Sequence, residues 1–228
     1  MKHFCLFVLL FFDGFFGTPN FDKAVSLYQI GKYELAKPLF ETCLKENPKD
    51  YKSIEYLGDI AGHQKKWEDA ITQYKKLKNI FPQNATYWYK YGGALGMNAK
   101  TVNKFKALGM IDEIEFAFIK ATQLDNKHID SRWALVILYL ELPAIVGGSE
   151  KKAQKYANEL LDISKVDGYL AKGYIDEYFN RYNQAEVQYK KAHEIGNSKN
   201  TFQKLYNLYL NKLKDKTKAK KIKDQFDK

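Results

Sequence analysis

The sequence predicts an all-α protein built as a solenoid of repeated helix pairs. Apolar residues recur three and four positions apart, which is the period of a helix, and only five prolines interrupt the 228 residues. No stretch alternates polar and apolar residues for the length of a strand. A shift of 34 residues superposes similar residues in both helices of the expected pair. With 45% apolar residues, the chain can also bury a substantial core.

The first two units are the most regular. Ala36 aligns with Ala70, where a small side chain lets two helices cross closely, and the aromatic Phe40 aligns with Tyr74 one turn later. The other aligned sets are Tyr33 with Trp67, Cys43 with Leu77, Pro48 with Pro82, Asn20 with Ile54 and Trp88, and Ala24 with Gly58 and Gly92. Each proline is expected to end the second helix, because it has no N–H to continue it. The Cys43 position predicts a buried thiol and not a reactive one.

These motifs are carried by GKYELAKPLFETCLKENP and YLGDIAGHQKKWEDAITQYKKLKNIFP, and they resemble the tetratricopeptide-repeat (TPR) family over residues 18–228. The resemblance implies a right-handed α-solenoid of about five TPR helix pairs with a C-terminal capping helix or helix pair. The expected repeats are 18–50, 51–84, 85–128, 129–166 and 167–198, with a cap at 199–228. We expect one cooperative domain, since a single repeat cannot bury its apolar face alone.

The third and fourth units depart from the regular length. The counterparts of Ala70, Tyr74 and Leu77 are Ile114, Phe118 and Ala121, a step of 44 that leaves 97–110 as an insert. In the fourth unit, Pro143 is expected to end the first helix, the Gly147–Gly148 pair to form the turn, and Ser149 to cap the next helix. A phosphate cradle at the glycine pair is the disfavoured alternative, because the turn has neither the strand nor the spacing of a P-loop. The lengthened centre and the Pro-x-x-x-Gly-Gly turn resemble a subgroup of exported bacterial TPR proteins.

The net charge of +10 comes from lysine, because Arg132 and Arg181 are the only arginines. This composition disfavours nucleic-acid binding, which uses the bidentate guanidinium group. The segment 198–228 holds ten lysines against three aspartates. We expect this cap to be a solvated end of the solenoid; peripheral contact of its lysines with anionic surfaces is the alternative.

The N-terminal segment 1–17 has the pattern of a secretory signal. Lys2 and His3 precede an apolar run from Phe4 to Phe12, which is too short to span a bilayer as a permanent anchor. We therefore expect an exported protein of a bacterial periplasm or envelope. If the segment is not cleaved, the alternative is an extra N-terminal helix on a cytoplasmic protein.

The sequence shows no pattern that predicts an enzyme, a cofactor site or a metal site. The histidines are dispersed at positions 3, 63, 128 and 193, so no two of them suggest a metal pair. Asp112, Glu113 and Glu115 cluster near the start of an expected helix, where carboxylates favour the helix dipole and need no catalytic role.

The first helices of a TPR stack line a groove on its inner face, and this groove is the predicted partner-binding site. Projection of the helices places nine residues there: Tyr89, Gly93, Met97, Trp133, Ile137, Leu140, Tyr174, Glu177 and Tyr178. Large aromatic residues are frequent anchors of protein interfaces. The alternative is that the insert folds over these side chains and buries them. In the fourth unit, Arg132 and Trp133 compete for the same inner-face position.

The predicted function is that of a non-enzymatic scaffold or adaptor that holds a peptide or partner protein. The lysines and asparagines that chaperone-binding relatives use to hold a terminal carboxylate are not present; Glu55 and Asp59 stand in the second unit. The alternative function is an exported solute-binding component, in which the insert closes a pocket lined by Tyr89, Met97 and Trp133.

Overall fold

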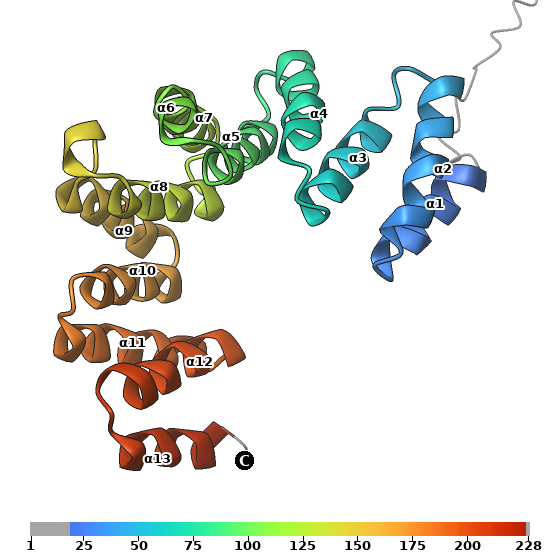
Figure 1. Ribbon diagram of the computed structural model, residues 1–228. Helices are drawn as coiled ribbons and strands as arrows, with labels where there is room; N and C mark the ends of the chain where they lie inside the picture. Colours follow the sequence, from blue (N-terminus) through green and yellow to red (C-terminus); the bar gives the residue numbers. More distant parts are fainter. Residues whose placement is uncertain (1–18, 227–228) are drawn as a thin grey trace, which may run out of the picture.

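The computed structural model describes residues 19–226, so the predicted signal segment 1–17 lies outside the described part of the chain. All regular elements of that part are helical (Figure 1). They are α1 (Pro19–Gln29), α2 (Tyr33–Glu46), α3 (Tyr51–His63), α4 (Trp67–Ile80), α5 (Ala85–Ala99), α6 (Lys104–Leu108), α7 (Ile111–Leu124), α8 (Ile129–Glu141), the 3-10 turn η1 (Ala144–Val146), α9 (Glu150–Ile163), α10 (Lys165–Tyr178), α11 (Tyr182–Gly196), α12 (Lys199–Asn207), the π-helical turn η2 (Leu208–Lys212) and α13 (Lys216–Phe226).

The helices pack as consecutive antiparallel pairs, as the sequence predicts. The pairs are α1 with α2, α3 with α4, α5 with α7, α8 with α9, and α10 with α11, and α12 with α13 closes the end. Figure 1 shows the pairs along a curved path, with α1–α4 in one arm of an arch, α5–α8 at the bend and α10–α13 in the other arm. The all-α solenoid fold is therefore confirmed.

Each regular pair is held by a small residue of the first helix packed under an aromatic ring of the second. A Cβ added to Gly58 would lie 2.7 Å from the Tyr74 ring, and one added to Gly92 would lie 3.0 Å from Phe118. A Cβ at Gly173 would collide with the Tyr189 ring in the same way. Real Cβ atoms essentially never approach a ring as closely as at Gly58 and Gly173, and the contact at Gly92 would be unusually tight, so packing favours glycine at all three positions.

In the fourth pair, α8 with α9, the large residue lies on the first helix and the small residue on the second, the reverse of the other pairs. Val136 of α8 stands at the helix position of Gly58 and Gly92, and it is fully buried. Ala157 of α9 stands where the other pairs have an aromatic residue, and it is also fully buried. The volume lost on one helix is thus supplied by the other, which keeps the interface filled.

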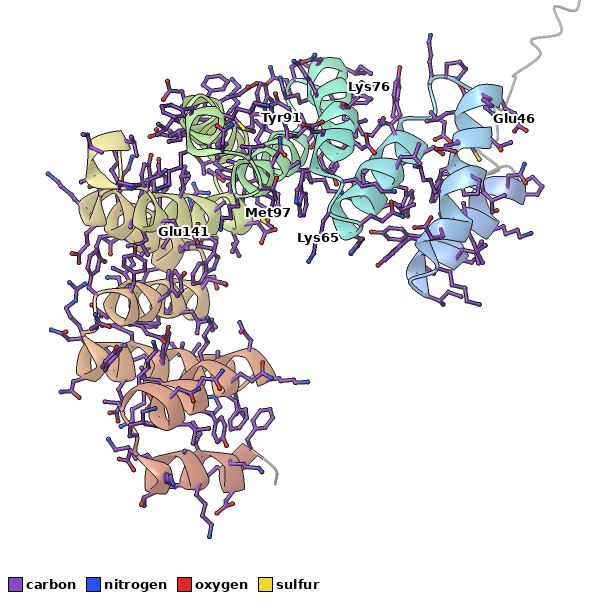
Figure 2. The ribbon with its side chains drawn as sticks, viewed as in Figure 1. Glu46, Lys65, Lys76, Tyr91, Met97 and Glu141 are labelled. Atoms are coloured by element: carbon purple, nitrogen blue, oxygen red, sulfur yellow. The ribbon has the colours of Figure 1, made fainter. Side chains whose placement is uncertain are left out.

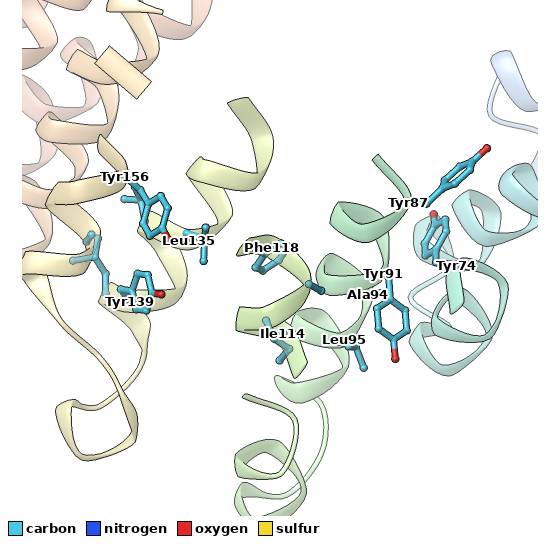
Figure 3. Close-up of a cluster of buried hydrophobic side chains, with 14 of the residues drawn as sticks. Tyr74, Tyr87, Tyr91, Ala94, Leu95, Ile114, Phe118, Leu135, Tyr139 and Tyr156 are labelled. Carbon is cyan, nitrogen blue, oxygen red and sulfur yellow. The ribbon is translucent and has the colours of Figure 1, made fainter. Parts of the chain in front are cut away.

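Three apolar clusters form the core, and the central one spans α3 to α10. Figure 3 shows its tyrosines and aliphatic side chains between α4 and α9, with Tyr74 and Tyr91 at one end and Tyr139 and Tyr156 at the other. A second cluster joins α10 to α13, and a third joins α1 to α3. Trp133 of α8 packs against both the central and the C-terminal cluster, so it links the bend to the arm formed by α10–α13.

The turn between α8 and α9 follows the sequence prediction. Helix α8 ends at Glu141, two residues before Pro143, and Gly147 has a left-handed φ of 100°. The Ser149 side chain accepts a hydrogen bond from the Lys152 backbone N–H and so caps α9. A Cβ at Gly148 would collide with the Leu142 carbonyl, so this glycine is required by backbone packing.

Candidate interaction surface

The nine predicted partner-binding residues lie on the first helices of three successive pairs. Helix α5 carries Tyr89, Gly93 and Met97, α8 carries Trp133, Ile137 and Leu140, and α10 carries Tyr174, Glu177 and Tyr178. Neighbouring helices in this series are in contact, α5 with α8 and α8 with α10. The three helices therefore present a continuous strip, although its members differ in exposure.

Helix α5 forms the open part of this strip around Gly93. A Cβ added to Gly93 would meet no heavy atom within 4 Å, in contrast to its neighbour Gly92. Met97 lies one turn further along the helix and is 42% exposed. Figure 2 shows Met97 on the side of α5 that faces the hollow of the arch. Gly93 is itself partly exposed, and we call the open space beside it the notch.

Tyr89 closes the other end of this notch and is itself partly covered. Its ring lies 6.1 Å from the Phe118 ring and 5.3 Å from the His128 ring, measured between centroids. Burial and the nearby Asp130 carboxylate raise the pKa of the Tyr89 hydroxyl, so the phenol stays neutral. Both of these ring contacts come from α7 and from the residue before α8.

Leu140 does not belong to the surface, and the structure corrects this prediction. Its side chain is only 4% exposed and lies in the central apolar cluster. The exposed residue at this end of α8 is the next one, Glu141, one helical turn after Ile137. A helical period of 3.6 residues permits either position, and the packing against the core decides between them.

The competition between Arg132 and Trp133 is resolved in favour of Trp133. Arg132 is buried toward α9, where its Nε donates to Glu159 Oε2 at 3.0 Å. Trp133 points toward α10, and its Nε1 donates to Asp167 Oδ1 at 3.0 Å. Its ring also forms an edge contact with Tyr174, with centroids 6.4 Å apart. Trp133 is thus half-buried, and these contacts hold α8 against α10.

Helix α10 completes the strip with the exposed Tyr178 and with Tyr174 and Glu177, which both contact other residues of the protein. Tyr178 is 46% exposed, while Glu177 Oε2 accepts a hydrogen bond from the buried Tyr189 hydroxyl at 2.9 Å. Tyr174 lies under Lys204 of α12, whose Nζ is 5.4 Å from the ring centroid. Burial, followed by the Glu141 charge, raises the pKa of Tyr174. Glu177 therefore orients a core tyrosine and is not a free ligand group.

An ion network between α3 and α5 was not predicted from the sequence. Lys90 Nζ lies 2.7 Å from Asp59 Oδ1 and 2.9 Å from Glu55 Oε1. The Tyr74 hydroxyl also donates to Asp59, at 2.6 Å. Opposite charges one repeat apart, on successive first helices, are the signal that could have identified it. The two acids share Lys90, and Lys52 Nζ also lies 3.1 Å from Glu55 Oε2, so both carboxylates are paired within the protein.

The electrostatics of the network follow from partial burial. Burial opposes ionisation of Glu55, but the hydrogen bonds and charges of Lys90 and Lys52 outweigh it and hold the Glu55 pKa below its usual value. Burial likewise disfavours the Lys90 cation, yet Asp59 and Glu55 raise the Lys90 pKa above its usual value. Both shifts stabilise the charged forms in the folded protein.

Two pockets lie away from the strip. One, of about 210 Å³, lies between α2, α3 and α4 and is lined by Leu57, Ile60 and Gln64 among others; the Gln64 Oε1 atom is buried there without a hydrogen-bond partner. The other runs along the lysine-rich face of α13. Neither pocket is lined by Tyr89, Met97 or Trp133, the residues expected for a closed solute site. Over residues 19–226, no group of histidine, cysteine and acidic side chains is arranged to hold a metal.

Comparison with known proteins identifies the architecture. The sequence profile described as "Tetratricopeptide repeat" matches residues 53–84, which cover most of α3 and all of α4. The fold is a tetratricopeptide-repeat solenoid. No curated protein matches the chain in sequence. Within residues 19–226, no helix of the TPR stack is long and apolar enough to cross a membrane.

Solved TPR proteins share this fold over most of their length. A thermophilic TPR protein of Thermus thermophilus, TTC0263, is 20% identical with a TM-score of 0.67, and the match covers 84% of this chain and 97% of that one. PilW, a type IV pilus biogenesis factor, is 16% identical with a TM-score of 0.66, and 90% of each chain is covered. YrrB, a TPR protein with an unusual peptide-binding site, is 14% identical with a TM-score of 0.53, and the match covers 80% of this chain and 88% of YrrB. At these identities the similarity is one of fold.

Proposed function

We propose that the protein is a non-enzymatic interaction scaffold that binds an extended segment of a partner protein along α5, α8 and α10. The TPR fold is typical of such scaffolds. The observation that carries the proposal for this strip is Gly93, a glycine inside a helix with open space beside it. The exposed Met97 and Tyr178 supply apolar contacts at the two ends of the strip.

Gly93 is costly in the free protein and has no packing role there. A glycine in a helix interior is less favourable than alanine by about 1 kcal/mol. Gly58, Gly92 and Gly173 repay this cost by admitting an aromatic ring, but nothing packs against Gly93. A partner backbone that approaches α5 closely at this point is a physical reason for the glycine. The segment would lie between Tyr89 and Met97.

The charges beside the strip are mostly paired within the protein. Lys100 and Glu141 form an ion pair at 2.7 Å, and Glu177 is held by Tyr189. The groups left available at the surface are therefore mainly apolar: Met97 and Tyr178 are exposed, and Ile137 is partly exposed. This composition favours a partner segment with apolar side chains over one recognised by its charge.

Substitution of Gly93 by leucine tests the proposal. Peptides selected for binding to the purified chain from a random display library should bind Gly93→Leu at least about tenfold more weakly, because the leucine fills the notch. The fold should persist, since leucine favours helices and the site is open. Phe116→Ala, an exposed apolar position on α7, is the matched control and should keep the affinity. Equal affinity of Gly93→Leu and the parent would exclude this strip as the binding surface.

The alternative of an exported solute-binding component is predicted from the sequence at a pocket closed by the insert and lined by Tyr89, Met97 and Trp133. The pocket between α2, α3 and α4 is a different place for such a site, and the same variant tests it. A small solute that binds in the pocket between α2, α3 and α4 would be insensitive to Gly93→Leu but sensitive to Leu57→Ala, which lines that pocket. Thermal stabilisation of both variants by candidate solutes would distinguish the two sites.

Export is a separate proposal that rests on the sequence of residues 1–17. A basic start followed by an apolar run from Phe4 to Phe12 favours secretion. Amino-terminal sequencing of the protein from its native cells tests it. A mature chain that begins near residue 18 would support export, and a chain that retains Lys2 and His3 would contradict it.

A further inference from the structure

The two most exposed large apolar side chains of the described residues lie on the two inserted segments. Phe105 of α6 is 88% exposed, and Ile145 of η1 is 93% exposed. Leu108, at the end of α6, is a third exposed apolar residue. Single exposed apolar residues are ordinary, but the concentration of the extreme cases on the two insertions is not expected from the repeat itself.

The two segments leave the solenoid side by side. Lys100 follows the last residue of α5, Glu141 ends α8, and their side chains form an ion pair at 2.7 Å. The first insertion continues from Lys100 into α6, and the second continues from Glu141 into η1. The two insertions therefore begin at neighbouring points, and Figure 1 shows α6 and the turn before α9 on the outer side of the arch.

Phe105 faces outward on a segment that is anchored at both ends. Ala99 and Met110 flank the insert, and both pack against the central apolar cluster. Asn103 caps α6 by accepting a hydrogen bond from the Lys106 backbone N–H. The insert thus has an inner side that holds it on the solenoid and an outer side that carries the phenylalanine.

The charge of the insert is purely basic. The segment 97–110 contains Lys100, Lys104 and Lys106 and no acidic residue. Lys100 is paired with Glu141, whereas the ion pairs of the described residues do not involve Lys104 or Lys106. These two lysines directly flank Phe105. An exposed aromatic tip between two lysines suits an anionic bilayer surface, where the ring enters the interface and the ammonium groups stay at the phosphate level.

We propose that this edge, Lys104, Phe105, Lys106 and Ile145, docks the protein peripherally on an anionic phospholipid surface. The docking is independent of partner binding on the inner strip. The C-terminal helix α13 is the other basic surface, but it exposes no large apolar side chain among residues 216–226. Charge alone would attract α13 to such a surface, whereas the edge adds insertion of two apolar side chains.

Co-sedimentation of the full chain with lipid vesicles tests the proposal. Vesicles of phosphatidylethanolamine with phosphatidylglycerol should bind the protein, and vesicles of phosphatidylcholine alone should bind it much less. The variant Lys104→Glu/Lys106→Glu should bind the anionic vesicles roughly thirtyfold or more weakly, since each lysine near such a surface contributes about a fivefold factor. Phe105→Ser/Ile145→Ser should lose roughly tenfold or more, because both apolar tips are removed.

Matched controls separate this edge from general charge and general apolar exposure. Lys220→Glu/Lys221→Glu changes the net charge equally but lies on α13, and Ile30→Ser/Phe116→Ser removes exposed apolar side chains elsewhere. Both controls should bind as the parent does. The proposal would be overturned if the parent did not bind anionic vesicles, or if a control variant lost as much binding as the edge variants. It would also be overturned if only the α13 control lost binding, because the contact would then belong to the C-terminal lysines. Circular dichroism of each variant verifies that the exposed substitutions leave the helices intact.

Discussion

The indole Nε1 of Trp133 donates a hydrogen bond to Asp167 Oδ1 at 3.0 Å, across exactly one repeat length of 34 residues. The same Asp167 carboxylate accepts from the Ser164 hydroxyl that caps α10. One side chain thus fixes the N-terminal turn of α10 on α8. Trp133 also packs between the central and C-terminal apolar clusters. It therefore supports the stack in addition to bordering the predicted binding strip.

Substitution of Trp133 should lower the free energy of unfolding. Trp133→Phe keeps most of the packing and loses the hydrogen bond to Asp167, at an expected cost of about 1 kcal/mol in the free energy of unfolding. Trp133→Ala should cost about 3 kcal/mol, because it also leaves a cavity between the two clusters. Urea unfolding curves measure both. Tyr178→Ala, at an exposed position, should change stability by less than about 0.5 kcal/mol. A Trp133→Ala variant as stable as the parent would show that its packing contributes little.

The helix glycines should separate into two classes when each is changed to alanine. Gly173→Ala should destabilise the protein by about 1–3 kcal/mol, because the new methyl group collides with the Tyr189 ring. Gly93→Ala should stabilise it by up to about 1 kcal/mol, because the site is open and alanine favours the helix. Both substitutions add one methyl group in a helix interior, so each controls for the other. In thermal and urea unfolding, the free energy of unfolding should fall for Gly173→Ala and rise for Gly93→Ala. Changes of the same sign in both variants would contradict the steric assignment.

The helix crossing at Ala70 gives a direct test of the repeat register. Ala70 is fully buried at the point where α4 packs in the central cluster. Ala70→Phe should overpack this crossing and lower the free energy of unfolding by about 1–3 kcal/mol. Glu68→Phe, two residues earlier at an exposed position of α4, is the control and should be nearly neutral. If Ala70→Phe unfolded at the same urea concentration as the parent, Ala70 would not be a crossing residue.

The regular parts of the fold were predictable because short-range spacing determines them. Ala36, Ala70 and Ala185 are all fully buried, and α2 and α4 both end two residues before their prolines. The surface was harder to predict. Leu140 and Glu141 are adjacent, both are compatible with a 3.6-residue period, and only contact with the core shows that Leu140 is inside. The spacing of apolar residues predicts that a helix forms. It does not determine which of two adjacent residues at the edge of the apolar face points into the core.

Contacts between successive repeats were also missed from the sequence, although they recur at the repeat period. The hydrogen bond from Trp133 to Asp167 spans 34 residues, and those from Lys90 to Asp59 and to Glu55 span 31 and 35. A search for opposite charges or hydrogen-bonding partners one repeat apart would have identified them. The positions of the exposed Phe105 and Ile145 could not be derived in this way, because the inserts have no counterpart in the regular repeats.

The network around Lys90 predicts how stability depends on pH. The folded-state pKa of Glu55 lies below its ordinary value of 4.5, so its contribution is present above that pH and is lost as the pH falls through the folded-state value. The folded-state pKa of Lys90 lies above 10.5, so its contribution is present below 10.5 and is lost as the pH rises through the folded-state value. The network should therefore contribute fully between these two limits.

Lys90→Met removes the cation of the network. Its loss of stability relative to the parent should be largest near pH 7 and smaller at acid pH. The change leaves Glu55 and Asp59, whose side chains are only 18% and 21% exposed, without the counter-charge of Lys90, so it should cost about 2 kcal/mol near pH 7. Protonation of Glu55 relieves the repulsion between the two carboxylates, and the difference from the parent should shrink as the pH falls toward about 4. Lys52→Met is the control, because Lys52 is 68% exposed and its pair with Glu55 should be worth less than about 0.5 kcal/mol. Urea unfolding of the three proteins near neutral pH and near pH 4 measures these differences; a Lys90→Met deficit that is the same at both pH values would show that the loss is one of packing and not of charge.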